Sequence, residues 1–249
     1  GLEASGLRGV VSFGAEDLPG GPGTPPWATV DHILEEQYAL EAAASASELV
    51  SFRYGVGTLL GQSDALLEAG TAECHARGWA VHTHLHETRE ELASSAERWG
   101  RRTAEHADDL GMLSRPLIAG HAVWVTDDDI ALLARTGTAV AHNPIANMIL
   151  GSGVAPIMAL TAAGIPVGIG TDGAASNDSQ NMLEAVKMMA ASWWIAVPAL
   201  LGTFVLLSRR RFPVMLLLLA VGASIALLQR PELAAALADA PVGFRLPAF

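Results

Sequence analysis

The chain has 249 residues, of which 51% are apolar and 16% charged, so it can bury a large core and is more apolar than an average soluble domain. Its formal net charge of −11, with no basic patch over residues 1–190, argues against a nucleic acid partner, because phosphate binding needs clustered Lys and Arg. The single cysteine, Cys74, excludes an internal disulfide and a multi-cysteine zinc site, and it fits a reducing compartment.

Short β-type runs alternate with longer runs of helical spacing over residues 1–190. The predicted strands are Arg8–Phe13, Ser51–Gly57, Ala80–His84, Leu117–Val123, Ala139–Asn143 and Val167–Thr171. The predicted helices are His32–Ser45, Ser63–Arg77, Arg89–Trp99, Asp127–Arg135, Val154–Ala163 and Gln180–Met189. Strands that alternate with helices of about ten or more residues form βα units on a parallel sheet. We therefore predict an α/β domain over residues 1–190.

The pattern changes after this domain. Residues 188–207 and 212–229 carry no charged side chain, and three arginines, Arg209–Arg211, separate them. Apolar runs of roughly 17–20 residues match the length that crosses a bilayer. We predict a two-helix transmembrane hairpin over residues 191–230, with membrane lipid as its partner, and a tail over residues 231–249. The alternative is a pair of buried helices in a soluble core.

Ionisable side chains recur where the predicted strands end. The segment His82-Thr83-His84-Leu85-His86-Glu87 closes one strand, and its three histidines would share one face if the strand stays extended. His121, His142-Asn143-Pro144 and Thr171-Asp172-Gly173 occupy the next three strand ends. In a βα barrel the active site lies at the carboxyl ends of the strands, so this order favours several ligands directed at one metal ion.

Each of these residues has a plainer interpretation when it is taken alone. A single histidine at a strand end is more often structural than a ligand, and Asp-Gly is usually a turn. We interpret His82 and His86 as packing or rim residues. The groups without predicted chemistry are His32, His75 and His106 (facing solvent), Asp127–Asp129 (a helix start favoured by the dipole) and Cys74 (a helix residue).

Two stretches resemble a known family. Residues His142 to Gly153 (HNPIANMILGSG) resemble the His-x-Pro-x-x-Asn-x-x-Leu-x-x-Gly signature of the amidohydrolase superfamily. The branch concerned holds cytosine, guanine, 8-oxoguanine and methylthioadenosine/S-adenosylhomocysteine deaminases and triazine hydrolases. Residues Gly170 to Asn177 (GTDGAASN) resemble the segment that closes its barrel. The resemblance implies a TIM-type (β/α) barrel, of which this chain would hold about strands three to eight.

The resemblance also implies roles for individual residues. His84 and Asp172 would bind one divalent metal ion, zinc or iron, and Asp172 would accept a proton from the bound water. His121 would either ligate the metal or hydrogen-bond the attacking hydroxide. Glu87 would be the general acid/base that carries a proton to the ring nitrogen and the leaving amine.

The implied reaction is hydrolysis of a non-peptide C–N bond, with metal-activated water as the nucleophile. The substrate class would be a small heterocycle, a purine, pyrimidine or relative that loses an amino group. His142 would order the loop after the seventh strand, and His142 and Asn143 would contact this substrate. By family the barrel would be cytoplasmic, or membrane-associated through the hairpin, and compatible with a homo-oligomer.

The chain departs from the family in two places. A His-x-His motif at the end of the first barrel strand should lie before His84, but His32 and His75 are isolated. Together with a start at Gly1, this predicts that strands one and two are missing. The apolar tail is the second departure, and its Arg209–Arg211 turn would be cytoplasmic although no signal peptide precedes the barrel. The competing hypotheses are a non-catalytic membrane-anchored barrel remnant, a chimeric gene product, and a metal-binding module without hydrolysis.

Overall fold

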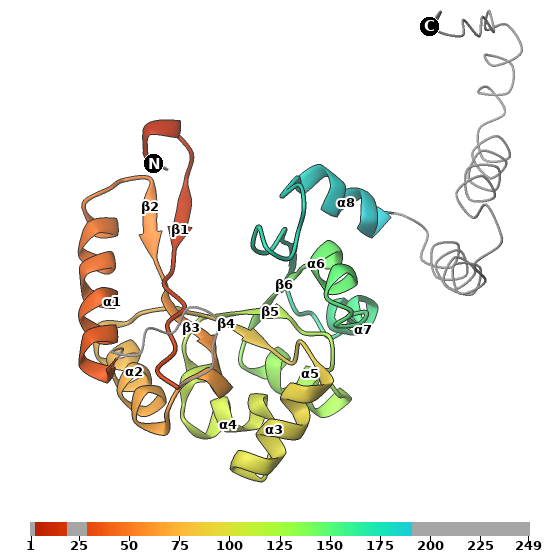
Figure 1. Ribbon diagram of the computed structural model, residues 1–249, viewed down its shortest axis with the longest axis horizontal. Coiled ribbons are helices and arrows are strands. Elements are labelled where there is room, and N and C mark those ends of the chain that lie inside the picture. Colours follow the sequence, from red (N-terminus) through yellow and green to blue (C-terminus); the bar gives the residue numbers. More distant parts are fainter. Residues whose placement is uncertain (1–2, 19–28, 191–249) are drawn as a thin grey trace, which may run out of the picture. The chain divides into compact units, whose positions relative to one another are not determined.

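Parallel strands form the centre of the structure, a computed structural model that describes residues 3–18 and 29–190 (Figure 1). The main sheet contains, in spatial order, β3 (Tyr54–Thr58), β4 (Val81–Leu85), β5 (Leu117–His121), β6 (Ala139–His142) and β7 (Val167–Ile169). A second, two-stranded parallel sheet contains β1 (Gly9–Val11) and β2 (Val50–Phe52). The predicted α/β fold with a parallel sheet is confirmed.

One segment of chain joins the two sheets. Only Arg53 separates β2 from β3; its amide donates to the carbonyl of Val11, and from Tyr54 onward the chain pairs with β4. The strand predicted at Ser51–Gly57 is therefore a single path that changes partner at Arg53. The described residues thus hold six parallel paths, an arrangement consistent with a partial (β/α) barrel.

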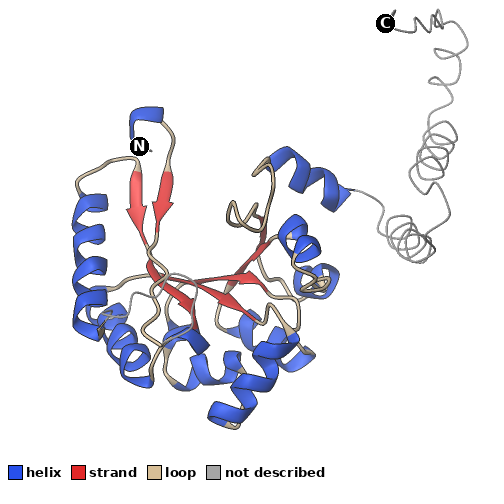
Figure 2. Cartoon of the chain, in the orientation of Figure 1, coloured by secondary structure: helices blue, strands red, loops and turns tan. Residues whose placement is uncertain are grey.

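The helices that connect the strands lie around the outside of the strand row, and a further helix follows the last strand (Figures 1 and 2). The α-helices of the described residues are α1 (Val30–Ser45), α2 (Asp64–Arg77), α3 (Arg89–Trp99), α4 (Thr103–Asp109), α5 (Asp127–Arg135), α6 (Pro144–Ile149), α7 (Ile157–Ala162) and α8 (Met182–Ala190). Short 3-10 turns occur at Glu3–Ser5, Leu59–Gly61 and Met112–Ser114.

Local capping explains why two predicted helices end close to where the sequence places them. α2 and α3 begin after Ser63 and Thr88, whose hydroxyls accept hydrogen bonds from backbone amides of the first turn. Both helices end at glycines in the left-handed region, Gly78 at φ 72° and Gly100 at φ 66°. These signals are local, so they are legible in the sequence.

Two short helices, α4 and α6, were missed by the sequence prediction. α4 has seven residues and α6 has six, which is too short for an apolar period to stand out. Pro144 at the first turn of α6 was the available signal, because proline is favoured there. α6 carries a residue of the metal centre described below, so this omission had a consequence.

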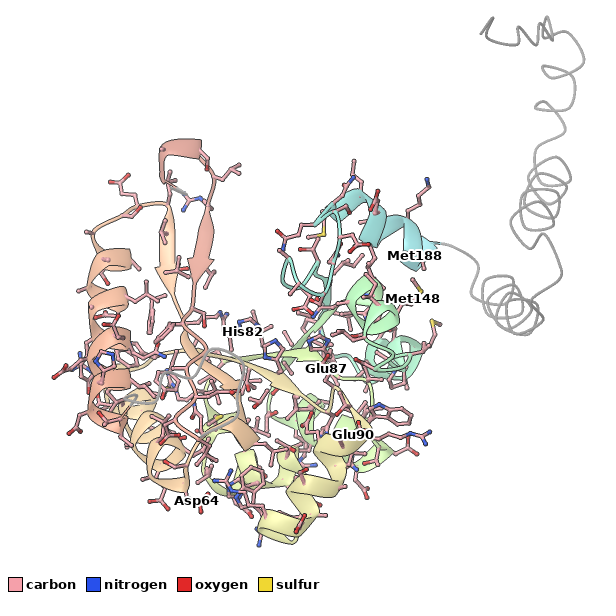
Figure 3. All side chains as sticks on the ribbon, in the orientation of Figure 1. Asp64, His82, Glu87, Glu90, Met148 and Met188 are labelled. Atoms are coloured by element: carbon pink, nitrogen blue, oxygen red, sulfur yellow. The ribbon has the colours of Figure 1, made fainter. Side chains whose placement is uncertain are left out.

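Burial alternates along β4 and divides the sheet into two faces. Val81, Thr83 and Leu85 are buried, whereas His82 and His84 are half-buried on the opposite face. The main apolar core lies on the first face, between strands and helices. In Figure 3, His82 lies on the side of the strands away from α2 and α4. The histidines therefore face the inside of the strand row.

In residues 3–18 and 29–190, no helix is both long and apolar enough to cross a membrane. The predicted transmembrane hairpin at residues 191–230 and the tail at residues 231–249 lie outside the described residues.

Truncation of a core side chain provides a test of this packing. Leu133 on α5 is fully buried in the main core, so Leu133→Ala should lower the free energy of unfolding by about 2–5 kcal/mol. Leu7→Ala removes the same atoms from a side chain that is 64% exposed and should change it by less than about 0.5 kcal/mol. Urea unfolding measures both. Equal losses in the two variants would contradict the described core.

Candidate metal centre

The side chain of His84 lies on the inner face of the sheet, and one of its ring nitrogens is hydrogen-bonded to the backbone. Its Nδ1 is 2.8 Å from the carbonyl oxygen of Gly57 on the neighbouring strand. A carbonyl oxygen only accepts, so Nδ1 carries the proton and Nε2 keeps its lone pair. Metal-binding histidines are usually oriented in this way, by a hydrogen bond from the nitrogen that does not bind the ion.

His121 is the last residue of β5 and lies beside His84. The register pairs His84 with Gly120 and Leu85 with His121, which brings the two strand ends together. The two imidazole rings stack with centroids 5.2 Å apart. His121 is buried, and its Nδ1 is 2.7 Å from Oδ1 of Asn147 on α6.

Asp172 follows the last strand, three residues beyond Ile169. Its Oδ2 accepts a hydrogen bond of 2.7 Å from the Ser176 hydroxyl. Burial opposes ionisation, but this bond, a backbone amide from Gly173 and the nearby histidines outweigh it and lower the pKa of Asp172. The carboxylate is therefore held in the anionic form that a metal ligand requires.

These three side chains meet at one point. Each of His84, His121 and Asp172 offers one ligand atom, and the three atoms lie within 4.8 Å of one another. Two imidazole nitrogens and one carboxylate oxygen form a donor set that suits Zn²⁺ and other divalent transition ions. The residues present thus fit the metal that the sequence predicts, in the same combination.

Glu87 lies next to this cluster, just past the end of β4, while Glu90 is at the start of α3 (Figure 3). Glu87 Oε2 is 3.5 Å from His121 Nε2, and Oε1 accepts a hydrogen bond of 3.2 Å from the Ser152 hydroxyl. A carboxylate in this position can exchange protons with a group bound at the cluster.

Two backbone hydrogen bonds fix the loop that carries Glu87. The carboxylate of Glu91 accepts from the amides of His86 and Glu87, each at 2.8 Å. Burial raises the pKa of Glu91, and these hydrogen bonds counteract the rise. Glu91 therefore acts on the site through the backbone, without facing the cluster.

His86 does not share a face with His82 and His84, because the strand does not stay extended as far as His86. β4 ends at Leu85, and His86 adopts a left-handed φ of 53°, which breaks the alternation of an extended strand. Its side chain is fully buried, with Nε2 3.3 Å from the amide nitrogen of Ala104. Burial lowers the pKa of His86 to about 4. It packs the strand end against the helices, as one of its two predicted roles requires.

In the acidic run at the start of α5, Asp129 forms a buried ion pair that the sequence did not indicate. Asp127–Asp129 do begin the helix, and Asp129 forms a capping box with Thr126. Asp129 is buried, accepts hydrogen bonds of 2.8 and 3.1 Å from Nε of Arg102, and is 3.6 Å from His86. The ion pair between Arg102 and Asp129 thus holds the start of α5 next to His86, at the end of β4.

The two residues predicted to contact substrate lie at the end of β6. Asn143 Nδ2 is 3.5 Å from His121 Nε2, which places the amide beside the cluster. His142 is buried, and its Nδ1 has no hydrogen-bond partner among the described residues. Burial, with His121 nearby, lowers the pKa of His142 to about 4.

The remaining residues without predicted chemistry have structural surroundings. His75 is exposed, whereas His106 is half-buried with its ring stacked on Trp99 at 4.1 Å between centroids. The expectation that His106 faces solvent is therefore wrong in part. Cys74 is buried within α2, and burial raises the pKa of its thiol to about 12.

Backbone strain gathers at the same strand ends. Among the described non-glycine residues, positive φ occurs at His86, His121, Ala122, Asp172 and Gln180. His121 and Asp172 are members of the cluster, and His86 and Ala122 directly follow the ends of β4 and β5. Such conformations cost about 1–3 kcal/mol each and persist where the surrounding structure imposes them, often at functional sites.

Three residues that contact the site have no role predicted from the sequence. They are Asn147, Ser152 and Glu91, which contact the site residues from α6, the loop after α6, and α3. Asn147 and Ser152 lie inside the motif of residues 142–153, so a signal existed. Its meaning depended on contacts that only the folded chain makes.

This chain is similar to known proteins in sequence. The profile of the amidohydrolase family matches residues 5–194. A 5-methylthioadenosine/S-adenosylhomocysteine deaminase from Thermococcus onnurineus is 38% identical over 186 residues, which are 75% of this chain and 43% of that protein.

Two solved structures resemble the fold. An adenosine deaminase from Xanthomonas campestris with bound zinc has a TM-score of 0.68 and 30% identity, over 76% of this chain and 42% of that one. An atrazine chlorohydrolase from Arthrobacter aurescens complexed with zinc has a TM-score of 0.71 and 26% identity, over 79% of this chain and 45% of that one. The chain thus spans less than half the length of each of these proteins.

The buried His86 should make stability depend on pH. Its folded-state pKa of about 4 lies below the ordinary value of 6.5. Between about pH 6.5 and pH 4 the unfolded chain binds a proton that the folded chain does not, so stability falls by up to about 3 kcal/mol as the pH drops. His86→Gln should lack this part of the loss, as measured by urea unfolding across that range.

His75→Gln, which alters an exposed ring, is the matched control and should follow the wild-type curve. If His86→Gln runs parallel to wild type across the whole range, then His86 is not held neutral by burial.

Metal binding tests the cluster directly. The chain should bind about one zinc ion, and Asp172→Ala should weaken binding by more than the roughly 10–100-fold that loss of an outer hydrogen-bond partner costs. Asp178→Ala removes an exposed carboxylate from the same loop and should have no effect. Equilibrium dialysis with elemental analysis measures all three. Equal zinc content in both variants would place the ion elsewhere.

Proposed function

The chain belongs to the amidohydrolase family, and we propose that its metal centre carries out the hydrolytic deamination of an amino-substituted heterocycle. The observation that carries the proposal is the position of Glu87, whose carboxylate lies 3.5 Å from His121 at the edge of the three-ligand cluster. A metal site alone needs no such neighbour. A deaminase needs a group that moves protons beside activated water.

The proposed ligands are Nε2 of His84, Nε2 of His121 and the carboxylate of Asp172. A divalent ion held there supplies a Lewis acid that makes water a nucleophile near neutral pH. Zinc is favoured over iron, since the similar structures contain zinc. Asp172, whose pKa is lowered, remains ionised at neutral pH and accepts a proton from the water.

Glu87 completes the exchange of protons. The water gives one proton to Glu87, which delivers it to the ring nitrogen, and the water oxygen bonds to the adjacent ring carbon that carries the amino group. The bond between that carbon and the exocyclic nitrogen then breaks, and the second water proton, accepted by Asp172, goes to the departing amine. The products are a ring carbonyl and ammonia, so the two protons of one water molecule are fully accounted for.

An adenine nucleoside is the proposed substrate class. The supporting comparisons are the methylthioadenosine/S-adenosylhomocysteine deaminase and the adenosine deaminase, each of which acts on the 6-amino group of an adenine ring by its name. Asn143, beside His121 Nε2, is proposed to donate to the bound heterocycle or to the water. Its short side chain reaches the cluster because Gly170 opposite it has no Cβ.

Substitution of Glu87 separates catalysis from metal binding. The zinc-loaded chain is incubated with adenosine or methylthioadenosine, and ammonia release is measured. Glu87→Gln keeps the shape of the side chain and should lower the rate by about 10²–10⁴-fold, because the amide cannot transfer protons. Its zinc content should equal that of wild type.

Glu90→Gln is the matched control, since Glu90 is exposed and three residues further along the chain. It should retain both zinc and turnover. A chain that binds zinc at the cluster but releases no ammonia from any amino-heterocycle would overturn the proposed function and leave a metal-binding module without hydrolysis.

A further inference from the structure

We infer that Asn147 is a positioning residue that holds the proton of His121 on Nδ1, so that Nε2 presents its lone pair to the metal centre. The inference rests on the proposed function and deepens it. It assigns a task to a residue that offers no ligand atom to the cluster but contacts one of its members, His121. It also decides between two roles for His121, metal ligand or hydrogen-bond donor to the attacking hydroxide.

The contact between the two side chains is short and enclosed. Asn147 is 2% exposed and His121 is 1% exposed. Asn147 Oδ1 is 2.7 Å from His121 Nδ1, well within the range of a normal hydrogen bond. An amide oxygen only accepts, so this contact requires a proton on Nδ1.

The backbone of Asn147 is fixed on both sides, so the side chain cannot withdraw easily. Its amide donates to the carbonyl of Asn143 at 3.0 Å, and its carbonyl accepts from the amide of Ser152 at 2.9 Å. The other end of the side chain, Nδ2, is buried with no hydrogen-bond partner among the described residues. Among the described residues, the contact of Oδ1 with His121 is therefore the hydrogen bond that holds this side chain.

Two groups near Nε2 of His121 favour opposite tautomers, and both are farther from the ring than Asn147 is. Asn143 Nδ2, a donor, is 3.5 Å from Nε2 and favours a lone pair there. Glu87 Oε2 is also 3.5 Å from Nε2 and favours a proton there. Both contacts, one N···N and one N···O, are longer than the 2.7–3.2 Å of a normal N–H···O hydrogen bond, whereas the Asn147 contact lies within that range. The short contact therefore sets the tautomer.

The consequence concerns the first proton transfer. With its lone pair at Nε2, a neutral His121 can bind the ion or accept a proton, but it cannot donate toward the site. It becomes a donor only after it has taken up a proton. His84, held by Gly57, presents the same nitrogen, so both imidazoles face the centre in the same tautomer.

The test observes the tautomer without relying on turnover. The metal-free full chain is labelled with ¹⁵N, and two-bond ¹H–¹⁵N spectra are recorded near pH 8, above the ordinary histidine pKa of about 6.5. Loss of signals in His121→Gln assigns the ring. Wild type should show His121 protonated on Nδ1. Asn147→Leu, of similar size, should give a mixture of tautomers and bind zinc roughly 10–100-fold more weakly.

Two further variants guard against a general loss of structure. Asn147→Asp keeps an oxygen at the same position, so it should retain the Nδ1 proton and zinc affinity. Gln62→Leu removes another fully buried amide, whose Nε2 donates to the carbonyl of Ala15 at 2.6 Å, and should leave His121 unchanged. The proposal is overturned if wild-type His121 carries its proton mainly on Nε2, or if Asn147→Leu leaves the tautomer as in wild type.

The outcomes separate this inference from the proposed function. An Nδ1 proton that depends on Asn147 in a chain without turnover would retain the inference and reject the deaminase. Turnover with His121 protonated on Nε2 would retain the deaminase and reject the inference. His121 would then be a donor to the attacking hydroxide.

Discussion

The pairing of β4 with β5 is the constraint on which the centre depends. The ladder runs in unbroken register from Val81 opposite Leu117 to Leu85 opposite His121. It continues beyond the strands, since the amide of Ala122 donates to Leu85 and the amides of Val123 and Trp124 donate to His86. The loop after β4, which carries His86 and Glu87, is thereby hydrogen-bonded to the segment that follows His121 at the end of β5. A shift of one residue would turn His84 into the core and remove it from the site.

The centre also depends on buried polar groups that would be costly if unpaired. Asp129 is neutralised by Arg102, Glu91 is satisfied by backbone amides, and Asn147 is bonded to His121. Loss of one partner from such a group costs about 1–3 kcal/mol or more, because the other group stays buried without a hydrogen bond. These contacts surround His86 and His121, two of the residues that hold a left-handed φ.

Much of the fold could be predicted because its signals are local. The alternation of β-type and helical runs gave the βα order, and the ends of α2, α3 and α5 follow from caps and a dipole-favoured acidic start. The failures have local reasons as well. α4 and α6 are too short to show a period, and β2 and β3 read as one strand because the exchange of partners at Arg53 leaves no mark on composition.

The sequence by itself determined which residue types stand at the strand ends, and in what order. That order predicts several ligands directed at one metal ion, because parallel strands bring their carboxyl ends to one edge. The roles of His84, His121 and Asp172 as ligands and of Glu87 as acid/base rest on the family resemblance. Only the tertiary structure decided which nitrogen of each histidine is free, because Gly57 and Asn147 reach the rings from distant parts of the chain. It also decided that His86 turns into the core, since a left-handed residue after Leu85 ends the alternation. Hydrogen bonds between residues far apart in sequence have no periodic signature, so they become visible only when the chain is folded.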